Sequence, residues 1–485
     1  MPDDVRPIRA KFDAPRRYAN FGPCLVGMSV HGFRGIDALE LDFEFPITVF
    51  SGTNGSGKST LGQLAVCAYK KPAAAQEYKR YYVRDFFPAS VADPDPFSAT
   101  ARVVFHYETD VVGTPQELTV SRAMQEWSGY KRQPERHCYY VGFSIYLPKV
   151  ERRDFSIYRS TVLELRDVRE IPEDIRAWVA RILNQPYEGV HFQGIGTSKR
   201  QGELAMARRL GAMYSENNMG FGEGRVLYMV DLFENAPEKS LFVLEEPETS
   251  LHPDAQHRLA KYLLNVVKRR HHQVILSTHS GAILGALPAE ARRLIHRDGQ
   301  GVRAYAGVST VQMNAVLSGG YQRLDVLVED VFAKRLLIEI LRAEAPDLVG
   351  MVRVTAVGSH KSVSEGLRLL NQLGRLGVGF VDGDTGGNLA NGVSVLPGDC
   401  APERVVFGAT GVQAELEEAY GVDACHLTVG DPEVDHHEYV SRVAQACALP
   451  DGALSVHACR AFAEELDQAE RQRITNFVRE RAADR

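Results

Sequence analysis

The sequence lacks the features that would place the protein in a membrane or among disulfide-rich proteins. No apolar run approaches the roughly 20 residues that a membrane-spanning helix needs, and residues 1–20 are charged and contain no apolar core of a signal peptide. Seven cysteines are scattered without CxxC pairs or histidines at zinc spacing, so we interpret them as reduced and buried. The formal net charge is only −6, which gives no global reason to expect nucleic-acid binding. We therefore expect a cytoplasmic protein without a membrane partner.

Internal repeats and low-complexity segments are also missing, so the 485 residues should form two or three ordinary globular domains. We expect a charged lead-in at 1–22, a first α/β domain at 23–318 and a second at 319–485, with the boundary at a turn near 318–323. Within the first domain, 75–210 has an irregular, strand-like pattern that predicts an α+β insertion. Basic residues and tyrosines at 78–84 and 130–140 suit contact with a nucleic acid or a second copy, or simply a solvated surface.

Apolar runs and helical spacing predict the main elements. In the first domain we expect strands at 24–30, 38–43, 47–51, 242–246 and 273–277, and helices at 59–71 and 253–270. In the second we expect strands at 325–328, 352–357 and 378–381, alternating with helices at 332–343 and 363–373. Strands that alternate with short helices predict a parallel sheet.

A glycine-rich loop joins the third predicted strand to the helix that follows it. It fits the pattern GxxxxGK[ST] and comprises Gly52, Thr53, Asn54, Gly55, Ser56, Gly57, Lys58 and Ser59, with Thr60 next in the helix. Glycines let backbone N–H groups close around phosphate, and the helix N-terminus favours negative charge. Lys58 would reach the β- and γ-phosphates of ATP, and the Ser59 hydroxyl would ligate Mg²⁺.

Two later strands end in side chains that complete such a site. The strand at 242–246 ends in Glu245, which would hold Mg²⁺ through water, and Glu246, which would orient or activate the attacking water. The strand at 273–277 is followed by His279, which would sense the γ-phosphate from beside Glu246. The sequence therefore predicts an ATP-hydrolysing site.

These motifs resemble those of ABC-type ATPases, in particular the branch that contains SMC-like repair proteins and ATPases of the OLD (overcoming lysogenization defect) family. The segment EEPETSLHP at 245–253 resembles the family's Walker B and D-loop, and STHS at 277–280 its switch. The segment MGFGEGR at 219–225 resembles the signature loop, with Gly220 where serine is usual and with Gly222 and Glu223 following. The segment HGFRGI at 31–36 resembles a strand turn whose arginine, here Arg34, approaches the nucleotide.

The resemblance implies that one chain is not enough. In the family, the signature loop of one subunit covers the γ-phosphate held by the other, so we expect a homodimer or a larger even-numbered oligomer. The predicted fold is α/β: an ABC-type P-loop ATPase domain with an inserted α+β region, followed by a smaller α/β domain with C-terminal helices.

Two predicted strands of the second domain are also followed by acidic residues. Glu329 follows one strand, and Asp382 and Asp384 follow another; such carboxylates suit Mg²⁺ or Mn²⁺ and phosphodiester cleavage. Their order resembles a Toprim domain, the nuclease module of OLD-family proteins, which implies that Glu329 is the acid/base residue or a metal ligand and that both aspartates hold metal. The match departs from the family because position 333 is alanine and no lysine follows Lys361.

Two functions stay open. In one, the protein is an ATP-regulated nuclease that cleaves DNA or RNA in prokaryotic antiphage defence. In the other, it resembles the ATPase subunits of Septu- and PARIS-type defence systems, and its degenerate Toprim-like domain belongs to a scaffold that holds and releases a separate effector protein.

Overall fold

The computed structural model describes residues 2–75, 79–90, 93, 97–123, 126–146, 164–196, 201–298, 301–308, 313, 324–373 and 375–483. The chain divides into two units, Met1–Thr310 and Val311–Arg485, and each is described by itself. Most of the predicted boundary at 318–323 falls outside the described residues. Both units mix helices with sheets, which confirms the α/β class.

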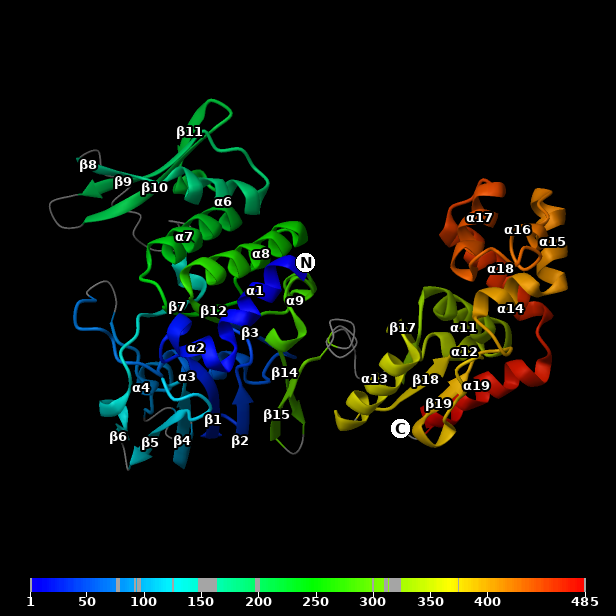
Figure 1. The fold of residues 1–485 in the computed structure, drawn as a ribbon, viewed down its shortest axis with the longest axis horizontal. Helices are drawn as coiled ribbons and strands as arrows, with labels where there is room; N and C mark the ends of the chain where they lie inside the picture. The colour runs from blue at the N-terminus through cyan, green and yellow to red at the C-terminus, as the bar shows by residue number, and fades with distance from the viewer. Residues whose placement is uncertain are drawn as a thin grey trace. The chain divides into compact units, whose positions relative to one another are not determined.

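A six-stranded sheet forms the centre of the first unit (Figure 1). Its order is β15-β14-β3-β13-β12-β7, and all neighbours pair in parallel except β14 with β15. The strands are β3 (Ile47–Ser51), β7 (Cys138–Val141), β12 (Leu241–Glu245), β13 (Gln273–Ser277), β14 (Arg292–Asp298) and β15 (Gly301–Ala306). Strands β3 and β13 are buried along their whole length, as expected for parallel strands covered on both faces.

Helices cover this sheet. They are α3 (Lys58–Val66), α7 (Phe221–Asn235), α8 (Pro253–Arg270) and α9 (Gly281–Ala286). The predicted strand at 273–277 and helix at 253–270 have the predicted bounds, but the helix predicted at 59–71 is wrong at its C-terminal end. The chain leaves the helix after Val66 because Lys70 forms a parallel bridge with Glu135 instead.

A second, antiparallel sheet has the order β2-β1-β4-β5-β6. Its strands are β1 (Leu25–Phe33), β2 (Ile36–Asp42), β4 (Phe97–Tyr107), β5 (Gln116–Ala123) and β6 (Glu126–Ser128), and the short helix α4 (Val83–Phe86) precedes β4. Buried side chains of β1 and β4, such as Met28 and Phe105, share one core with Leu61 and Leu64 of α3.

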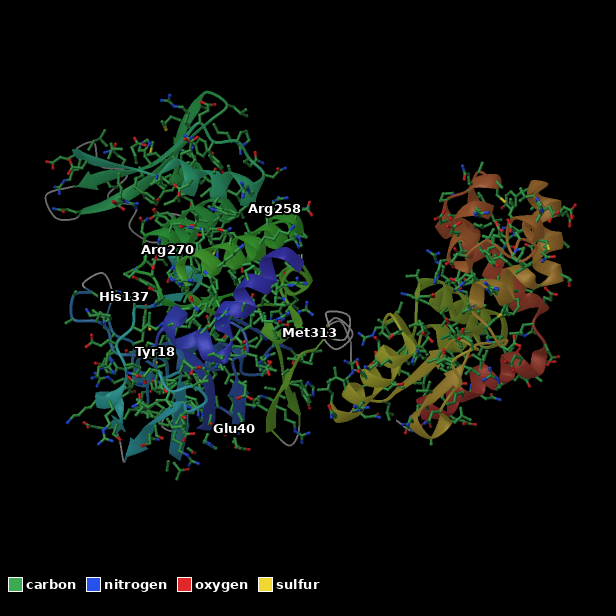
Figure 2. The ribbon with its side chains drawn as sticks, in the orientation of Figure 1. Tyr18, Glu40, His137, Arg258, Arg270 and Met313 are labelled. Atoms are coloured by element: carbon green, nitrogen blue, oxygen red, sulfur yellow. The ribbon has the colours of Figure 1, made fainter. Side chains whose placement is uncertain are left out.

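The segment predicted as an insertion, 75–210, contributes to three sheets. Strands β4–β6 extend the antiparallel sheet and β7 is an edge strand of the central sheet. Among the described residues of this segment, β8 (Glu164–Glu170), β9 (Gly189–Gly196) and β10 (Gln201–Arg209) form a separate sheet with the following strand β11 (Ala212–Ser215), beside α6 (Glu173–Leu183) and beyond α7 (Figure 1). Arg258 of α8 (Figure 2) donates a hydrogen bond to the Ile182 carbonyl (2.8 Å) and so ties α6 to the helices of the central sheet.

The basic and aromatic residues of this stretch pack against each other. The guanidinium of Arg80 lies 5.0 Å from the ring centre of Tyr82 and 5.5 Å from that of Tyr130, and it donates to Gln133 (2.7 Å). Tyr78 lies outside the described residues. These side chains therefore stabilise the loop that leads into β7.

The lead-in at 1–22 forms two helices, α1 (Pro2–Phe12) and α2 (Ala14–Phe21). Helix α1 packs on α8, and Ile8, Phe12 and Phe21 are buried. This charged segment therefore also has an apolar face, which its composition did not predict.

The second unit has a four-stranded, all-parallel sheet of order β17-β16-β18-β19, which confirms the predicted parallel sheet. Its strands are β16 (Leu324–Val328), β17 (Val352–Ala356), β18 (Gly377–Val381) and β19 (Val393–Val395). Helix α13 (His360–Gln372) covers one face, while α11 (Val331–Glu344) and α19 (Gln468–Ala483) contact the other side. The remaining helices are α12 (Pro346–Val349), α14 (Pro402–Gly408), α15 (Thr410–Tyr420), α16 (Ala424–Leu427), α17 (Tyr439–Ala446) and α18 (Asp451–Glu465). None of the described helices is both long and apolar enough to span a bilayer.

Candidate functional site

The glycine-rich loop runs from the end of β3 into the first turn of α3. Its backbone needs glycine at two positions, because Gly55 (φ +75°) and Gly57 (φ +105°) adopt left-handed conformations. A Cβ atom at Gly52 would lie 2.0 Å from the Ile295 carbonyl oxygen, so only glycine fits there. The loop is therefore held in a shape that directs backbone N–H groups toward a phosphate.

Lys58 is folded back onto this loop. It is 7% exposed, and its Nζ donates hydrogen bonds to the carbonyl oxygens of Gly52 (3.0 Å) and Thr53 (2.9 Å). Burial lowers the pKa of Lys58, and the negative charge of Glu246 opposes that shift. The Ser56 hydroxyl is buried without a hydrogen-bond partner among the described residues, whereas Ser59 is exposed. Buried donors of this kind fit a phosphate group.

The two glutamates follow one another at the end of β12. Glu245 keeps one buried carboxylate oxygen, Oε1, that has no hydrogen-bond partner among the described residues. Such an oxygen suits a hydrated Mg²⁺. Glu246 sits at φ +41°, a left-handed conformation that is unusual for a residue with a side chain.

His279 meets Glu246 because of the strand order. Strand β13 lies between β3 and β12, so its C-terminal end falls between the phosphate loop and the acidic strand end. The His279 Nε2 atom lies 3.6 Å from Glu246 Oε1. Burial, and then the positive charge of Lys58, lower the pKa of His279, and Glu246 raises it. The structure thus brings Lys58, Glu246 and His279 into one electrostatic group.

A buried arginine that the sequence analysis took only as part of the signature loop holds the acidic turn in place. Arg225 of α7 is fully buried, and its Nη2 donates hydrogen bonds to the carbonyl oxygens of Glu245 (2.9 Å) and Glu246 (3.0 Å). Burial lowers the pKa of Arg225, while Glu248 and Glu246 raise it. The guanidinium supports the strained turn at Glu246.

Glu248 links the turn to the switch strand. Its carboxylate is 8% exposed and accepts hydrogen bonds from the Thr278 hydroxyl and from the His279 backbone N–H (3.2 Å). Burial raises the pKa of Glu248. Nothing in the spacing of EEPET identifies this partner, because it comes from a strand about 30 residues later in the chain.

The signature-like loop begins α7. Gly220 caps the helix, and a Cβ atom at Gly222 would lie 2.5 Å from the Ser250 carbonyl oxygen, so the helix start packs tightly on the D-loop-like turn. The Glu223 carboxylate accepts hydrogen bonds from the hydroxyls of Tyr187 (2.7 Å) and Tyr214 (2.6 Å). Both tyrosines belong to the region of the β8–β11 sheet, which is thereby coupled to the loop.

Arg34 lies in the turn between β1 and β2. It is exposed and has φ +44°, and its guanidinium lies 5.0 Å from the ring centre of Phe87. The following strand adjoins the phosphate loop, because a Cβ atom at Gly57 would lie 3.3 Å from Ile36 Cδ1. The turn is therefore near the loop, although the guanidinium packs on an aromatic ring.

The second unit brings its acids to the carboxyl ends of β16 and β18. The backbone N–H of Asp382 donates a hydrogen bond to Glu329 Oε1 (3.0 Å), and Asp382 Oδ1 is buried without a partner among the described residues. Burial, and then the charges of Glu329 and Asp330, raise the pKa of Asp382 to about 7. Asp384 is exposed and accepts a hydrogen bond from the Thr385 hydroxyl (3.1 Å). This donor set fits a divalent cation, which would relieve the repulsion between carboxylates.

Glu403 joins this cluster and was not assigned from the sequence. It lies in the first turn of α14, is 6% exposed, and burial raises its pKa to about 7. Asp330, by contrast, caps α11 by accepting a hydrogen bond from the Ala333 N–H (2.7 Å). The Asp330 carboxylate is therefore used by the start of helix α11.

Among the described residues, only Asp435, His436 and His437 bring three metal-ligating atoms within 4.8 Å of one another. Asp435 also caps the short helical turn by accepting a hydrogen bond from the His437 N–H (3.0 Å). Glu329, Asp382 and Asp384 do not form so close a group.

Two family models match the chain. One, described as an AAA domain, matches residues 28–80, and the other, described as an AAA ATPase domain, matches residues 167–284. The first range contains the glycine-rich loop, and the second contains Glu245, Glu246 and His279. No match was found among curated proteins. The site and these two models together define the class of the first unit: residues 28–80 and 167–284 match AAA ATPase domains and carry the residues of a P-loop ATP site.

Solved structures give a distant likeness. The SMC head domain from Thermotoga maritima is 15% identical with a TM-score of 0.34, and the match covers 58% of this chain and 98% of that chain. The SMC head bound to the C-winged helix domain of ScpA is 15% identical with a TM-score of 0.36, covering 59% of this chain and 98% of that one. Likeness this distant supports no statement about activity or partners.

Proposed function

We propose that the protein hydrolyses ATP at an ABC-type site that a second copy of the chain completes. Lys58 and the backbone amides of 52–59 hold the phosphates, while Ser59 and Glu245 hold Mg²⁺, which neutralises phosphate charge when bound. Glu246 orients the attacking water, and His279 contacts the γ-phosphate. The observation that carries the proposal is the 3.6 Å approach of His279 to Glu246, with both side chains coupled to the charge of Lys58.

ATP hydrolysis tests this proposal directly. Phosphate release by the purified full chain should require Mg²⁺. Lys58→Ala should lose ATP binding, whereas Glu246→Gln should keep binding and lose hydrolysis. Hydrolysis at the wild-type rate in both variants would overturn the proposal.

We propose that the γ-phosphate is covered by residues 220–223 of a second copy, which predicts a homodimer or a larger even-numbered oligomer. Gly220 leaves only backbone amides for this contact, and the packing of Gly222 on the Ser250 turn fixes their position. Glu246→Gln with ATP should shift the mass measured by light scattering from monomer to dimer. A monomer at saturating ATP would contradict the shared site.

For the second unit, we propose a Toprim-like nuclease that acts in prokaryotic antiphage defence under the control of the ATPase. Glu329 and Asp382 would hold Mg²⁺ or Mn²⁺ with Asp384, and the cation supplies charge neutralisation at a phosphodiester. Support comes from the Asp382–Glu329 contact and the partnerless buried oxygen of Asp382. Plasmid nicking and RNA cleavage with each metal, with and without ATP, test this activity, and Asp382→Asn should abolish it.

A second candidate is a scaffold that holds and releases an effector protein. It is favoured by the use of Asp330 as a helix cap, by buried Ala333 and by the absence of any lysine after Lys361. No cleavage with any metal, together with co-purification of the product of a neighbouring gene, would support the scaffold. Protection of cells by the chain alone would count against it.

A further inference from the structure

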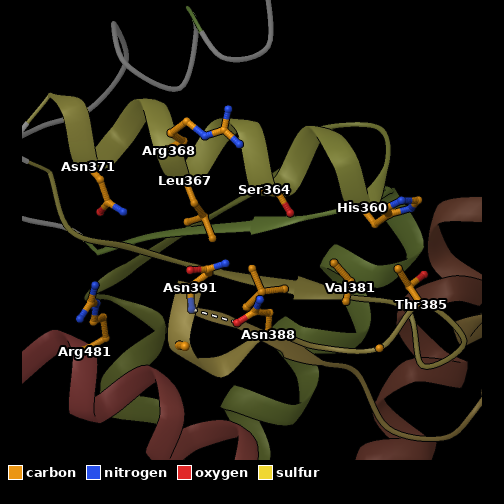
Figure 3. Close-up of a pocket in the computed structure, with 13 residues that line it drawn as sticks. His360, Ser364, Leu367, Arg368, Asn371, Val381, Thr385, Asn388, Asn391 and Arg481 are labelled. Atoms are coloured by element: carbon orange, nitrogen blue, oxygen red, sulfur yellow. Dashed lines mark hydrogen bonds between the residues drawn. The ribbon is translucent and has the colours of Figure 1, made fainter.

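The second unit contains a cavity of about 600 Å³ that no step of the proposed ATPase uses. It lies between α13 and the loop that joins β18 to β19, with Arg481 of α19 at its edge (Figure 3). Ser364, Leu367 and Asn371 come from α13, and Asn388 and Asn391 come from the loop. The other lining residues are His360, Arg368, Val381, Thr385, Gly386, Ala390, Val393 and Arg481.

The polar lining of this cavity is basic or neutral. Its titratable side chains are two arginines and a histidine, namely Arg368, Arg481 and His360, and no carboxylate lines it. The remaining polar groups are amides and hydroxyls, which can all donate hydrogen bonds. In a chain whose formal net charge is −6, this concentration of donors suits an anion with several oxygen acceptors.

Three apolar side chains lie under the cavity. Leu367, Val381 and Val393 are at most 5% exposed and belong to the small core between α13 and the sheet. They support the wall of the cavity, and the surface that a ligand would meet is mostly polar. A volume of this size is typical of pockets that hold small organic ligands.

The cavity adjoins the acidic cluster along the chain. Val381 immediately precedes Asp382, and Thr385 donates its hydroxyl to Asp384 (3.1 Å). A ligand in the cavity therefore lies beside the loop that carries the carboxylates proposed to hold metal.

We propose that this cavity binds one phosphorylated nucleotide, with its phosphate held by Arg368 and the neighbouring amides. The inference rests on the proposed nuclease function in one respect: it identifies the cavity as the subsite for the nucleotide beside the bond to be cut. A free mononucleotide carries the same base and phosphate as a nucleotide within a strand, so the experiment compares the binding of these two ligands.

Binding is measured by fluorescence anisotropy of a labelled single-stranded oligonucleotide and by competition with unlabelled AMP, in EDTA to prevent cleavage. All variants are made in the full chain with Lys58→Ala, so that the phosphate loop does not contribute. Arg368→Ala should weaken binding about tenfold, the loss expected for one charge-assisted hydrogen bond. Ser364→Trp, at an exposed position, should fill the cavity and abolish binding while keeping the charge. Arg460→Ala, which removes an exposed arginine of the same unit that does not line the cavity, is the matched control and should bind normally.

Competition by AMP means that a free nucleotide suffices, and binding of the oligonucleotide alone means that the strand is required; both support the subsite. Equal binding by the three variants, or no binding of either probe, overturns it. Cleavage is scored separately with Asp382→Asn. If binding depends on Arg368 but no cleavage is seen, the nuclease proposal is refuted and the nucleotide subsite is supported. If cleavage is seen and does not depend on Arg368, the nuclease proposal is supported and the subsite is refuted.

Discussion

Replacing Arg225 with methionine tests whether a buried guanidinium positions the catalytic strand end. Arg225 donates hydrogen bonds to the carbonyl oxygens of Glu245 (2.9 Å) and Glu246 (3.0 Å), and no part of it is exposed. Glu246 is held at φ +41°, a conformation that costs about 1–3 kcal/mol unless its surroundings enforce it. We expect the turn to relax when these two donors are removed.

The contacts of Arg225 give the expected size of the losses in stability and in kcat. Hydrogen bonds from a charged donor are worth about 1.5–3 kcal/mol each, and part of that gain is offset by the desolvation of a buried guanidinium. We therefore expect the free energy of unfolding to fall by about 2–4 kcal/mol. A displacement of a reacting group by about 1 Å can lower kcat about 100-fold, so we expect a kcat loss of that size. The KM for ATP should change little, because Lys58 and its loop remain.

The assay combines steady-state phosphate release with urea unfolding of the same preparations. Arg292→Met is the matched control: Arg292 is also buried and donates to the backbone carbonyls of Leu284 (2.9 Å) and Leu287 (2.5 Å), but it does not touch the acidic turn. The control should lose stability and keep kcat. If Arg225→Met loses stability but keeps its kcat, the guanidinium is merely structural and the positioning argument is refuted.

Further predictions concern three other contacts. Replacing Tyr187 and Tyr214 together with phenylalanine frees the Glu223 carboxylate, and we expect kcat to fall while the chain stays folded, measured by phosphate release and circular dichroism. Burial lowers the pKa of His272 to about 3, so the folded unit binds fewer protons than the unfolded chain between about pH 3 and 6.5. The His272 contribution to the free energy of unfolding is therefore fully present above pH 6.5, and the free energy should be about 2 kcal/mol lower at pH 5. In His272→Gln, the free energy of unfolding measured in urea should depend less on pH. Asp325 is 1% exposed and accepts from two arginine side chains, so Asp325→Ala should destabilise the second unit by about 3–5 kcal/mol in the same assay.

Each of these has an outcome that contradicts it. An unchanged kcat in the double tyrosine variant would separate the β8–β11 sheet from the site. A pH slope that survives in His272→Gln would assign the slope to other groups. Stability of Asp325→Ala equal to that of a surface change such as Asp347→Ala, whose ion pair is exposed, would mean that the buried arginines find other partners.

Local pattern was a good guide to the elements that carry the chemistry. Strand β13 and helix α8 have the predicted bounds because buried apolar runs and a proline start mark them within the sequence itself. The end of α3 was mispredicted because a bridge between Lys70 and Glu135 ends the helix, and no local signal announces that partner. Pairing with β1 and β12 decides where β4 and β7 belong, and the irregular pattern of 75–210 does not reveal those partners.

The sequence by itself determined the parts of the ATP site that consecutive residues build. A phosphate loop is made of neighbouring backbone amides around glycines, so its spacing is visible from Gly52 to Ser59. Only the tertiary structure decided which side chains hold that site, namely Arg225 under Glu246 and Glu248 against Thr278. In the second unit it likewise decided that Glu403 joins Asp382. These groups come from segments far apart in the chain, and their burial and charge coupling exist only after the sheets have formed.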